Sequence, residues 1–183
     1  MGCAAGFAIS LVDERTKGTL VRLRIAPIGR MHILAGKALA CGLTTIAAPT
    51  VLLLLAVVAF GVRPDSWPLL GVAVVCVALC FVGIMMLLSV LGKTERSAAG
   101  IGWAVLIVIA MIGGGTIPLA FMPPWMQPLS HLSPVKWSIL AMEGAIWRNF
   151  SAAELALPCG ILVAVGLLCF TIGTRAFRWS EEG

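Results

Sequence analysis

Long apolar stretches separated by short polar clusters make up most of the 183-residue chain. Runs without a charged residue cover residues 38–62, 66–92 and 97–135. A bilayer core of roughly 30 Å is crossed by about 20 apolar residues of α-helix, so each run can hold a spanning helix. Strands of membrane barrels alternate polar and apolar residues, and these runs do not. The pattern predicts an all-α, polytopic helical membrane protein.

The hydrophobic pattern predicts four complete transmembrane helices, at residues 38–61, 67–91, 98–117 and 155–174. A further apolar segment, residues 1–12, would form a helix of only about 18 Å, which is too short to cross a bilayer. It carries neither the positive n-region nor the small-residue cleavage site of a signal peptide. We interpret it as the end of a truncated span within a single membrane domain, residues 1–183.

Composition and charge agree with a helical membrane protein and predict which ends of its helices face the cytoplasm. Charged residues are 11% of the chain, against about 25% in soluble domains. Ten of the 13 Lys and Arg residues lie in segment 13–37, in the 93–96 turn and after residue 174, whereas Arg63, Lys136 and Arg148 lie on the opposite side. The positive-inside rule therefore predicts a cytoplasmic C-terminus and a cytoplasmic segment 13–37. Topology and anionic membrane lipids account for the net charge of +5, so no nucleic-acid partner is expected.

The inner segment, residues 13–37, is rich in basic residues. Gly18 and Pro27 punctuate it and leave room for a short helix from Thr19 to Ala26, in which basic and apolar residues are interleaved. This composition is typical of an element that lies on the membrane surface or docks on a partner. An ordinary positive-inside loop is the alternative, although the segment is longer than a connection between two helices needs.

The outer segment, residues 118–147, contains five prolines and directly follows the run Gly113–Gly115. A continuous helix is impossible there. Ser133 as N-cap and Pro134 as first helical residue predict a short helix. One stripe of that helix consists of Trp137, Leu140, Ala141, Gly144 and Trp147.

Irregular backbone at membrane depth survives only against protein or a water-filled cavity, which favours short re-entrant helices over the alternative of an exposed loop. Ser151 and Glu154 form the sequence pattern of a capping box that begins the last span. Pro158 is expected to kink that span near its start.

Residues that could relay ions, bind metals or catalyse a reaction are scarce. No Asp, Glu, Lys, Arg or His lies in the middle of a predicted span, so the sequence offers no ion or proton relay. The six cysteines all lie in apolar runs without metal-ligand spacing, and we interpret Cys76 and Cys80 as small buried residues. We therefore predict no catalytic residue, no metal and no cofactor of the chain's own. Either the protein conducts passively or another component supplies energy.

The inner and outer segments together resemble the membrane subunits of ATP-binding-cassette exporters, the type-2 permease family that includes bacterial multidrug and antibiotic exporters. The inner match consists of Glu14, Arg15, Gly18, Thr19, Leu20, Pro27, Gly36 and Lys37. The outer match consists of Pro118, Leu119, Met122, Pro123, Trp125 and Pro134. The order of spans is similar to the last two-thirds of such a subunit, which usually has six.

The resemblance implies a role for each segment. Residues of the inner segment would couple the protein to an ABC ATPase subunit, namely Glu14, Arg15, Gly18, Thr19 and Pro27. Short re-entrant helices would close the outer end of the translocation path, with Pro118, Pro123, Trp125, Pro134 and Trp137 as candidate gate residues. ATP would be bound by the partner, a second permease copy would complete the transporter, and the assembly would lie in the plasma (inner) membrane of a prokaryote among its lipids.

Two hypotheses from other classes stay open at this stage. One is a non-transporting membrane assembly or anchor protein, which would gather partners through glycine-rich helix faces. The other is a membrane-embedded enzyme, which the lack of an acidic cluster or a metal-ligand set disfavours.

Overall fold

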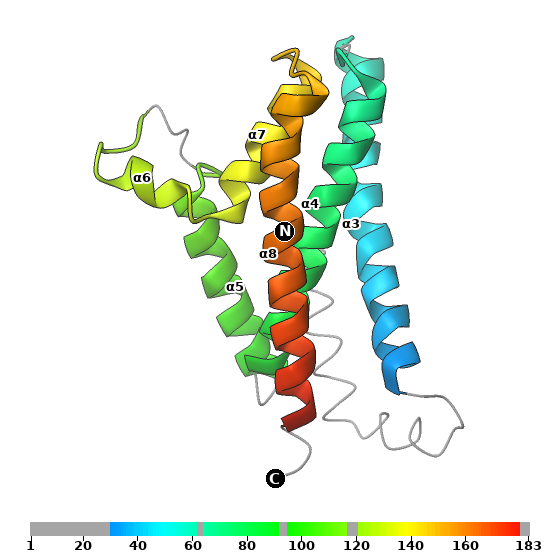
Figure 1. The fold of residues 1–183 in the computed structure, drawn as a ribbon, viewed down its shortest axis with the longest axis vertical. Helices are drawn as coiled ribbons and strands as arrows, with labels where there is room; N and C mark the ends of the chain where they lie inside the picture. The colour runs from blue at the N-terminus through cyan, green and yellow to red at the C-terminus, as the bar shows by residue number, and fades with distance from the viewer. Residues whose placement is uncertain (1–29, 62–63, 92–94, 117–120, 180–183) are drawn as a thin grey trace.

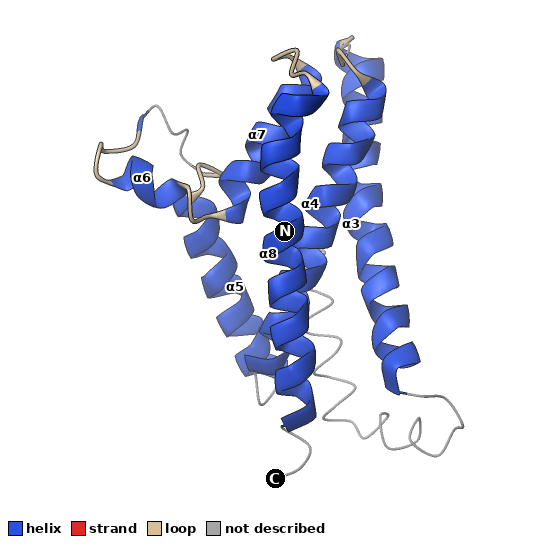
Figure 2. Cartoon of the chain, viewed as in Figure 1, coloured by secondary structure: helices blue, strands red, loops and turns tan. Residues whose placement is uncertain are grey.

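The computed structural model describes residues 30–61, 64–91, 95–116 and 121–179. These residues form helices joined by short loops, and the described part of the chain contains no strand (Figure 2). The all-helical prediction is confirmed. The apolar segment 1–12 and most of the inner segment lie outside the described residues.

Three helices are long and apolar enough to cross a membrane. They are α3 (Arg30–Phe60), α4 (Trp67–Leu91) and α8 (Ala152–Trp179), with apolar spans at Leu39–Phe60, Trp67–Leu88 and Ala152–Arg175. The helices α3 and α8 extend beyond the predicted spans because helical backbone continues into the polar flanks. In particular, α3 begins at Arg30, within the segment predicted to be the cytoplasmic connection.

Helix α5 (Glu95–Ile112) is shorter than the predicted span at residues 98–117. Its last turn closes with bonds from Gly113 N to the Ile109 carbonyl (2.9 Å) and from Gly115 N to the Ala110 carbonyl (2.8 Å). Gly114 then turns the chain with a φ of 84°, a conformation open to glycine. The apolar part, Gly100–Ile112, is shorter than the spans of the other three helices. The count of four complete spans stays a prediction.

Helix α8 begins at the predicted capping box. Ser151 N donates to Glu154 Oε2 at 2.8 Å, and Glu154 N donates back to Ser151 Oγ at 3.4 Å. The helix then continues through Pro158 without interruption, and this proline is fully buried. The predicted kink therefore does not break the helix.

Helix α4 is the centre of the bundle. It packs against α3, α5, α7 (Pro134–Ile146) and α8, and its contact with α8 is the most extensive of the structure (Figure 1). Glycines bring the two backbones together, because Gly83 of α4 lies directly against the Gly166 backbone. Two turns along, Gly173 of α8 lies against the backbone of Met86 and Leu87. Small residues of this kind are what allow close helix packing where lipid replaces water.

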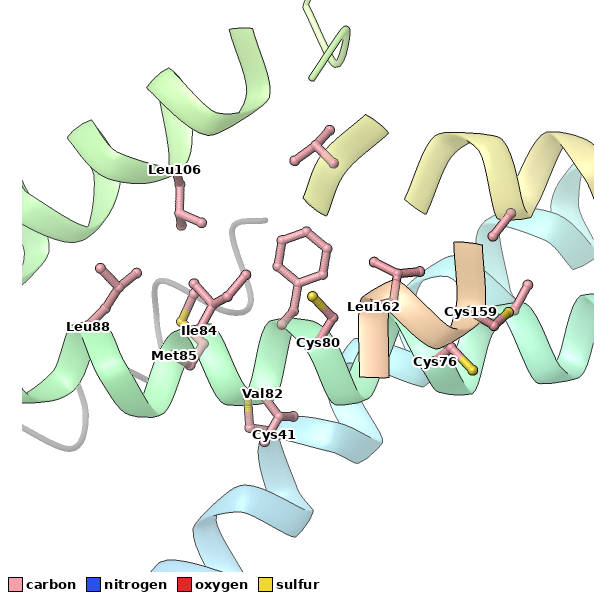
Figure 3. Close-up of a cluster of buried hydrophobic side chains, with 14 of the residues drawn as sticks. Cys41, Cys76, Cys80, Val82, Ile84, Met85, Leu88, Leu106, Cys159 and Leu162 are labelled. Carbon is pink, nitrogen blue, oxygen red and sulfur yellow. The ribbon is translucent and has the colours of Figure 1, made fainter. Parts of the chain in front are cut away.

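The buried side chains form one cluster around α4 (Figure 3). Helix α4 contributes most of it, including Cys76, Cys80, Ile84, Met85 and Leu88. Neighbouring helices add Cys41 from α3, Leu106 from α5, and Cys159 and Leu162 from α8. The interpretation of Cys76 and Cys80 as small buried residues is confirmed.

A glycine substitution tests the α4–α8 contact. A Cβ at position 166 would lie 2.8 Å from both the Cys80 Cα and the Leu79 carbonyl oxygen. Because backbone atoms cannot move aside as a flexible side chain can, Gly166→Ala should destabilise the fold by about 1–3 kcal/mol. The measurement is the midpoint of SDS or thermal unfolding of the membrane-extracted protein.

Gly160 is the matched control on the same helix, since nothing lies within 4 Å of a Cβ added there. Gly160→Ala should leave the midpoint unchanged or raise it slightly, because alanine is the better helix former. Equal losses in both variants would contradict a glycine-dependent contact.

Candidate functional site

The outer segment connects the outer end of α5 to the start of α8. Its described part contains the short helix α6 (Met126–Ser130) and the longer α7 (Pro134–Ile146). Helix α6 projects sideways from the bundle, below the ends of α3 and α8 at the top of Figure 1, and α7 returns between α5 and the α4–α8 pair.

The structure describes four of the five predicted gate residues. Pro123, Trp125, Pro134 and Trp137 are described, whereas Pro118 lies outside the described residues. The five predicted coupling residues also lie outside the described part of the chain: Glu14, Arg15, Gly18, Thr19 and Pro27.

Helix α7 begins as its sequence predicts. Ser133 is the N-cap and accepts a hydrogen bond from Val135 N at 3.3 Å, and Pro134 is the first helical residue. The stripe identified in the sequence does not coincide with the buried face: of its five members only Ala141 and Gly144 are buried, and Trp147 is exposed.

The buried face of α7 is instead made of small residues. Its members are Pro134, Val135, Ser138, Ala141, Gly144 and Ala145. The physical reason is that α7 packs against both α4 and α8. A helix held closely between two others buries its small side chains and keeps a bulky one, such as Trp147, at its edge.

The start of α7 is joined to the end of α5. Ser133 Oγ donates a 2.7 Å hydrogen bond to the Ile109 carbonyl of α5, which also accepts from Gly113 N at 2.9 Å. A Cβ on Gly113 would lie 2.7 Å from the Val135 Cβ and even closer to Ser133 Oγ. We call Ile109, Gly113, Ser133 and Val135 the α5–α7 joint. Sequence reasoning found Ser133 only as an N-cap, and the glycine run was the signal that a close approach exists there.

The two candidate tryptophans have different surroundings. Trp137 is half-buried; its Nε1 donates to the His131 carbonyl at 2.8 Å, and its ring meets the His131 ring edge-on at 5.8 Å. Trp125 is 68% exposed, and Phe121 and Leu132 near it are exposed by 81% and 82%. Trp137 therefore anchors the turn between α6 and α7, while most of the Trp125 side chain is exposed.

The far end of α7 is fastened in three ways. Asp65 N, in the connection between α3 and α4, donates to the Ile146 carbonyl at 3.3 Å. Arg148 pairs with Glu143 at 2.8 Å between Nη2 and Oε2. Phe150 lies against Gly144, where a Cβ would be only 2.8 Å from the ring Cγ.

The side chains of this region are suited to packing rather than to reaction. Among the described residues no group of three or more His, Cys, Asp or Glu side chains could hold a metal ion.

Comparison with known proteins decides the family. The model of the ABC-2 type transporter family matches residues 1–147, which include both the inner and the outer segment. The chain belongs to this family. With its three helices of spanning length, this ABC-2 type protein is a multi-pass membrane protein.

Individual relatives are permeases. The linearmycin resistance permease protein LnrN of Bacillus subtilis is 26% identical over 94% of this chain and 45% of its own length. The inner membrane transport permease YhhJ of Escherichia coli is 30% identical over 92% of this chain and 46% of its own. The probable doxorubicin resistance permease DrrC of Mycobacterium tuberculosis is 32% identical over 87% and 62%.

The chain therefore spans slightly less than half the length of LnrN and YhhJ. No solved structure gives a significant match.

The two tryptophans yield a stability prediction. Trp137→Ala removes a hydrogen bond and an aromatic contact and should lower the free energy of unfolding by about 1–3 kcal/mol. Trp125→Ala is the matched change at an exposed site and should stay within about 0.5 kcal/mol of the parent. Unfolding midpoints in the same detergent would measure both, and a larger loss for Trp125→Ala would contradict the assignment of Trp137 as the anchor.

Proposed function

We propose that the chain is the membrane subunit of an ATP-driven ABC exporter, which moves amphipathic compounds such as drugs, antibiotics or lipids out of the cell. The observation that carries the proposal is the family match over residues 1–147. The names of LnrN and DrrC, resistance permeases for linearmycin and doxorubicin, support export and the amphipathic class of compound.

The energy source in this proposal is a partner. The predicted spans contain no ionisable residue at their middle, so a gradient-driven mechanism has no relay in the sequence. An ABC ATPase subunit would bind ATP and dock on the inner segment through Glu14, Arg15, Gly18, Thr19 and Pro27. A second permease copy, identical or homologous, would complete the translocation path within the lipid of a prokaryotic inner membrane.

We further propose that α5 is the fourth span and that the outer segment completes it as a re-entrant pair of helices. Helix α7 ends at the level of the α3–α4 connection, because Asp65 N bonds the Ile146 carbonyl. A helix of 13 residues is about 20 Å long, so the start of α7 and the end of α5 lie well below that level. Gly113, α6 and Trp125 would then stand at membrane depth, where irregular backbone needs protein or water around it.

In this arrangement the outer segment is the outer gate. Pro123 lies before α6 and Pro134 is the first residue of α7, so both fit a chain that turns back on itself, and Trp137 fixes the turn between α6 and α7. Trp125 is the candidate plug, since its bulky side chain is 68% exposed. ATP binding would draw two ATPase domains together and shift the helices between inward- and outward-open states of different substrate affinity.

The orientation in the membrane is open to a labelling test. The outer loop residue Asn149 is exposed, whereas Ser180 follows the last helix on the predicted cytoplasmic side. In a variant stripped of its six native cysteines, an impermeant thiol reagent added outside intact cells should label Asn149→Cys and spare Ser180→Cys. Labelling of Ser180→Cys alone would reverse the topology and move the gate to the cytoplasm.

The coupling role of the inner segment gives the decisive test of function. Glu14→Lys reverses a charge, and Gly18→Val restricts the backbone at the predicted turn. Each should reduce capture of the ATPase partner by about tenfold and reduce ATP-dependent dye efflux from vesicles in proportion, with membrane insertion unchanged.

Asp65→Lys is the matched charge reversal on the opposite side of the membrane, and it should leave capture at the parental level. If capture is unaffected by all three substitutions, the inner segment is an ordinary loop. If the parent shows no ATP-dependent efflux with its partner, the transport proposal itself fails.

A further inference from the structure

The α5–α7 joint differs in kind from the other contacts of α7. Toward α4 and α8, α7 presents a face of small side chains such as Ala141 and Ala145. Packed helices of this kind can slide past one another by small shear movements. A sliding face by itself sets no fixed position for α7 along its own axis.

At its start, by contrast, α7 is held to α5 by a directional hydrogen bond and by close packing. The Ser133 hydroxyl is shared between two helices: it donates to the Ile109 carbonyl at 2.7 Å and accepts from Val135 N at 3.3 Å. Ser133 and Val135 are both buried, so water cannot replace this bond at little cost. Gly113 leaves no free space between the two helices, because an added Cβ would meet the Ile109 oxygen at 3.0 Å and the Val135 Cβ at 2.7 Å.

The other end of α7 is bonded to the α3–α4 connection and leads through residues 147–151 into α8. Asp65 N donates to the Ile146 carbonyl at 3.3 Å. Helix α7 is thus a rod of 13 residues with a backbone bond to Asp65 at one end, a fixed joint to α5 at the other, and a face of small side chains between them.

We propose that Ser133 is a positioning residue that makes the outer segment follow α5: a displacement of the outer end of α5 is passed through the α5–α7 joint to the start of α7. The rod then swings about its tie to Asp65 and carries α6 and Trp125 with it. This inference rests on the proposed gate function and names the part of the chain that operates the gate.

Paired spin labels test the movement without knowledge of the substrate. Exposed positions are available on α5 (Val108), on the turn between α6 and α7 (Leu132) and on α8 (Leu168). In the complete transporter with its ATPase partner, with labelled chains diluted by unlabelled ones, two cysteine pairs are compared with and without a non-hydrolysable ATP analogue. The pairs are Val108→Cys with Leu132→Cys, and Leu132→Cys with Leu168→Cys.

If the α5–α7 joint passes on the movement, the distance between labels at positions 108 and 132 (the α5-to-turn distance) stays constant when nucleotide binds. The distance between labels at positions 132 and 168 (the turn-to-α8 distance) changes. Ser133→Ala should let the α5-to-turn distance vary and reduce the turn-to-α8 change by about half or more, and Ser133→Thr, which keeps the hydroxyl, should restore both. Ser138→Ala is the matched control, because Ser138 is buried on the same helix but donates only to the Pro134 carbonyl within α7, at 2.9 Å.

Two results would overturn the inference, and the first does not need the alanine variant to fold. One is an α5-to-turn distance that changes in the parent as much as the turn-to-α8 distance does. The other is a pair of serine variants, at positions 133 and 138, that both behave like the parent. Failure of the proposed function has a different signature, namely that nucleotide changes neither distance in the parent.

Discussion

The arrangement of the bundle depends on the backbone contact between Gly83 of α4 and Gly166 of α8. No side chain separates the two helices at this level, and Gly173 repeats the close approach further along α8. In a membrane, where lipid competes for apolar surface, close packing of backbones is the main attraction between helices. Among the described helices the α4–α8 contact is the most extensive, and both α3 and α5 pack against α4.

Helix α7 of the outer segment packs against both helices of this pair. Because α4 and α8 run side by side, they offer α7 a common surface, which α7 fills with Ser138, Ala141 and Ala145. Three glycines, Gly83, Gly166 and Gly173, are used inside the chain at the α4–α8 contact. Others, such as Gly71, Gly100 and Gly160, have nothing within 4 Å of an added Cβ.

Much of the fold could be predicted from the sequence because its determinants are local. The apolar runs specify α3, α4 and α8, Ser133 with Pro134 specifies the start of α7, and Ser151 with Glu154 specifies the start of α8. The buried face of α7 could not be predicted, because it depends on which helices lie beside it. Since α4 and α8 approach α7 closely, its small residues are buried and Trp147 is exposed. The bond from Ser133 to Ile109 joins positions 24 residues apart, and no local pattern encodes such a pairing. The inner candidate residues lie outside the described residues, so their role rests on the family pattern.

The partnership of α4 with α8 also has a consequence for biosynthesis. About 60 residues separate the end of α4 from the start of α8 in the chain. Because translation adds roughly 5–20 residues per second, α8 begins to be synthesised on the order of 3–12 seconds after α4 is complete. During that interval the groove at Gly83 faces lipid or the insertion machinery, so nascent chains stalled in this window would carry an unpaired central helix and be natural substrates for membrane quality control.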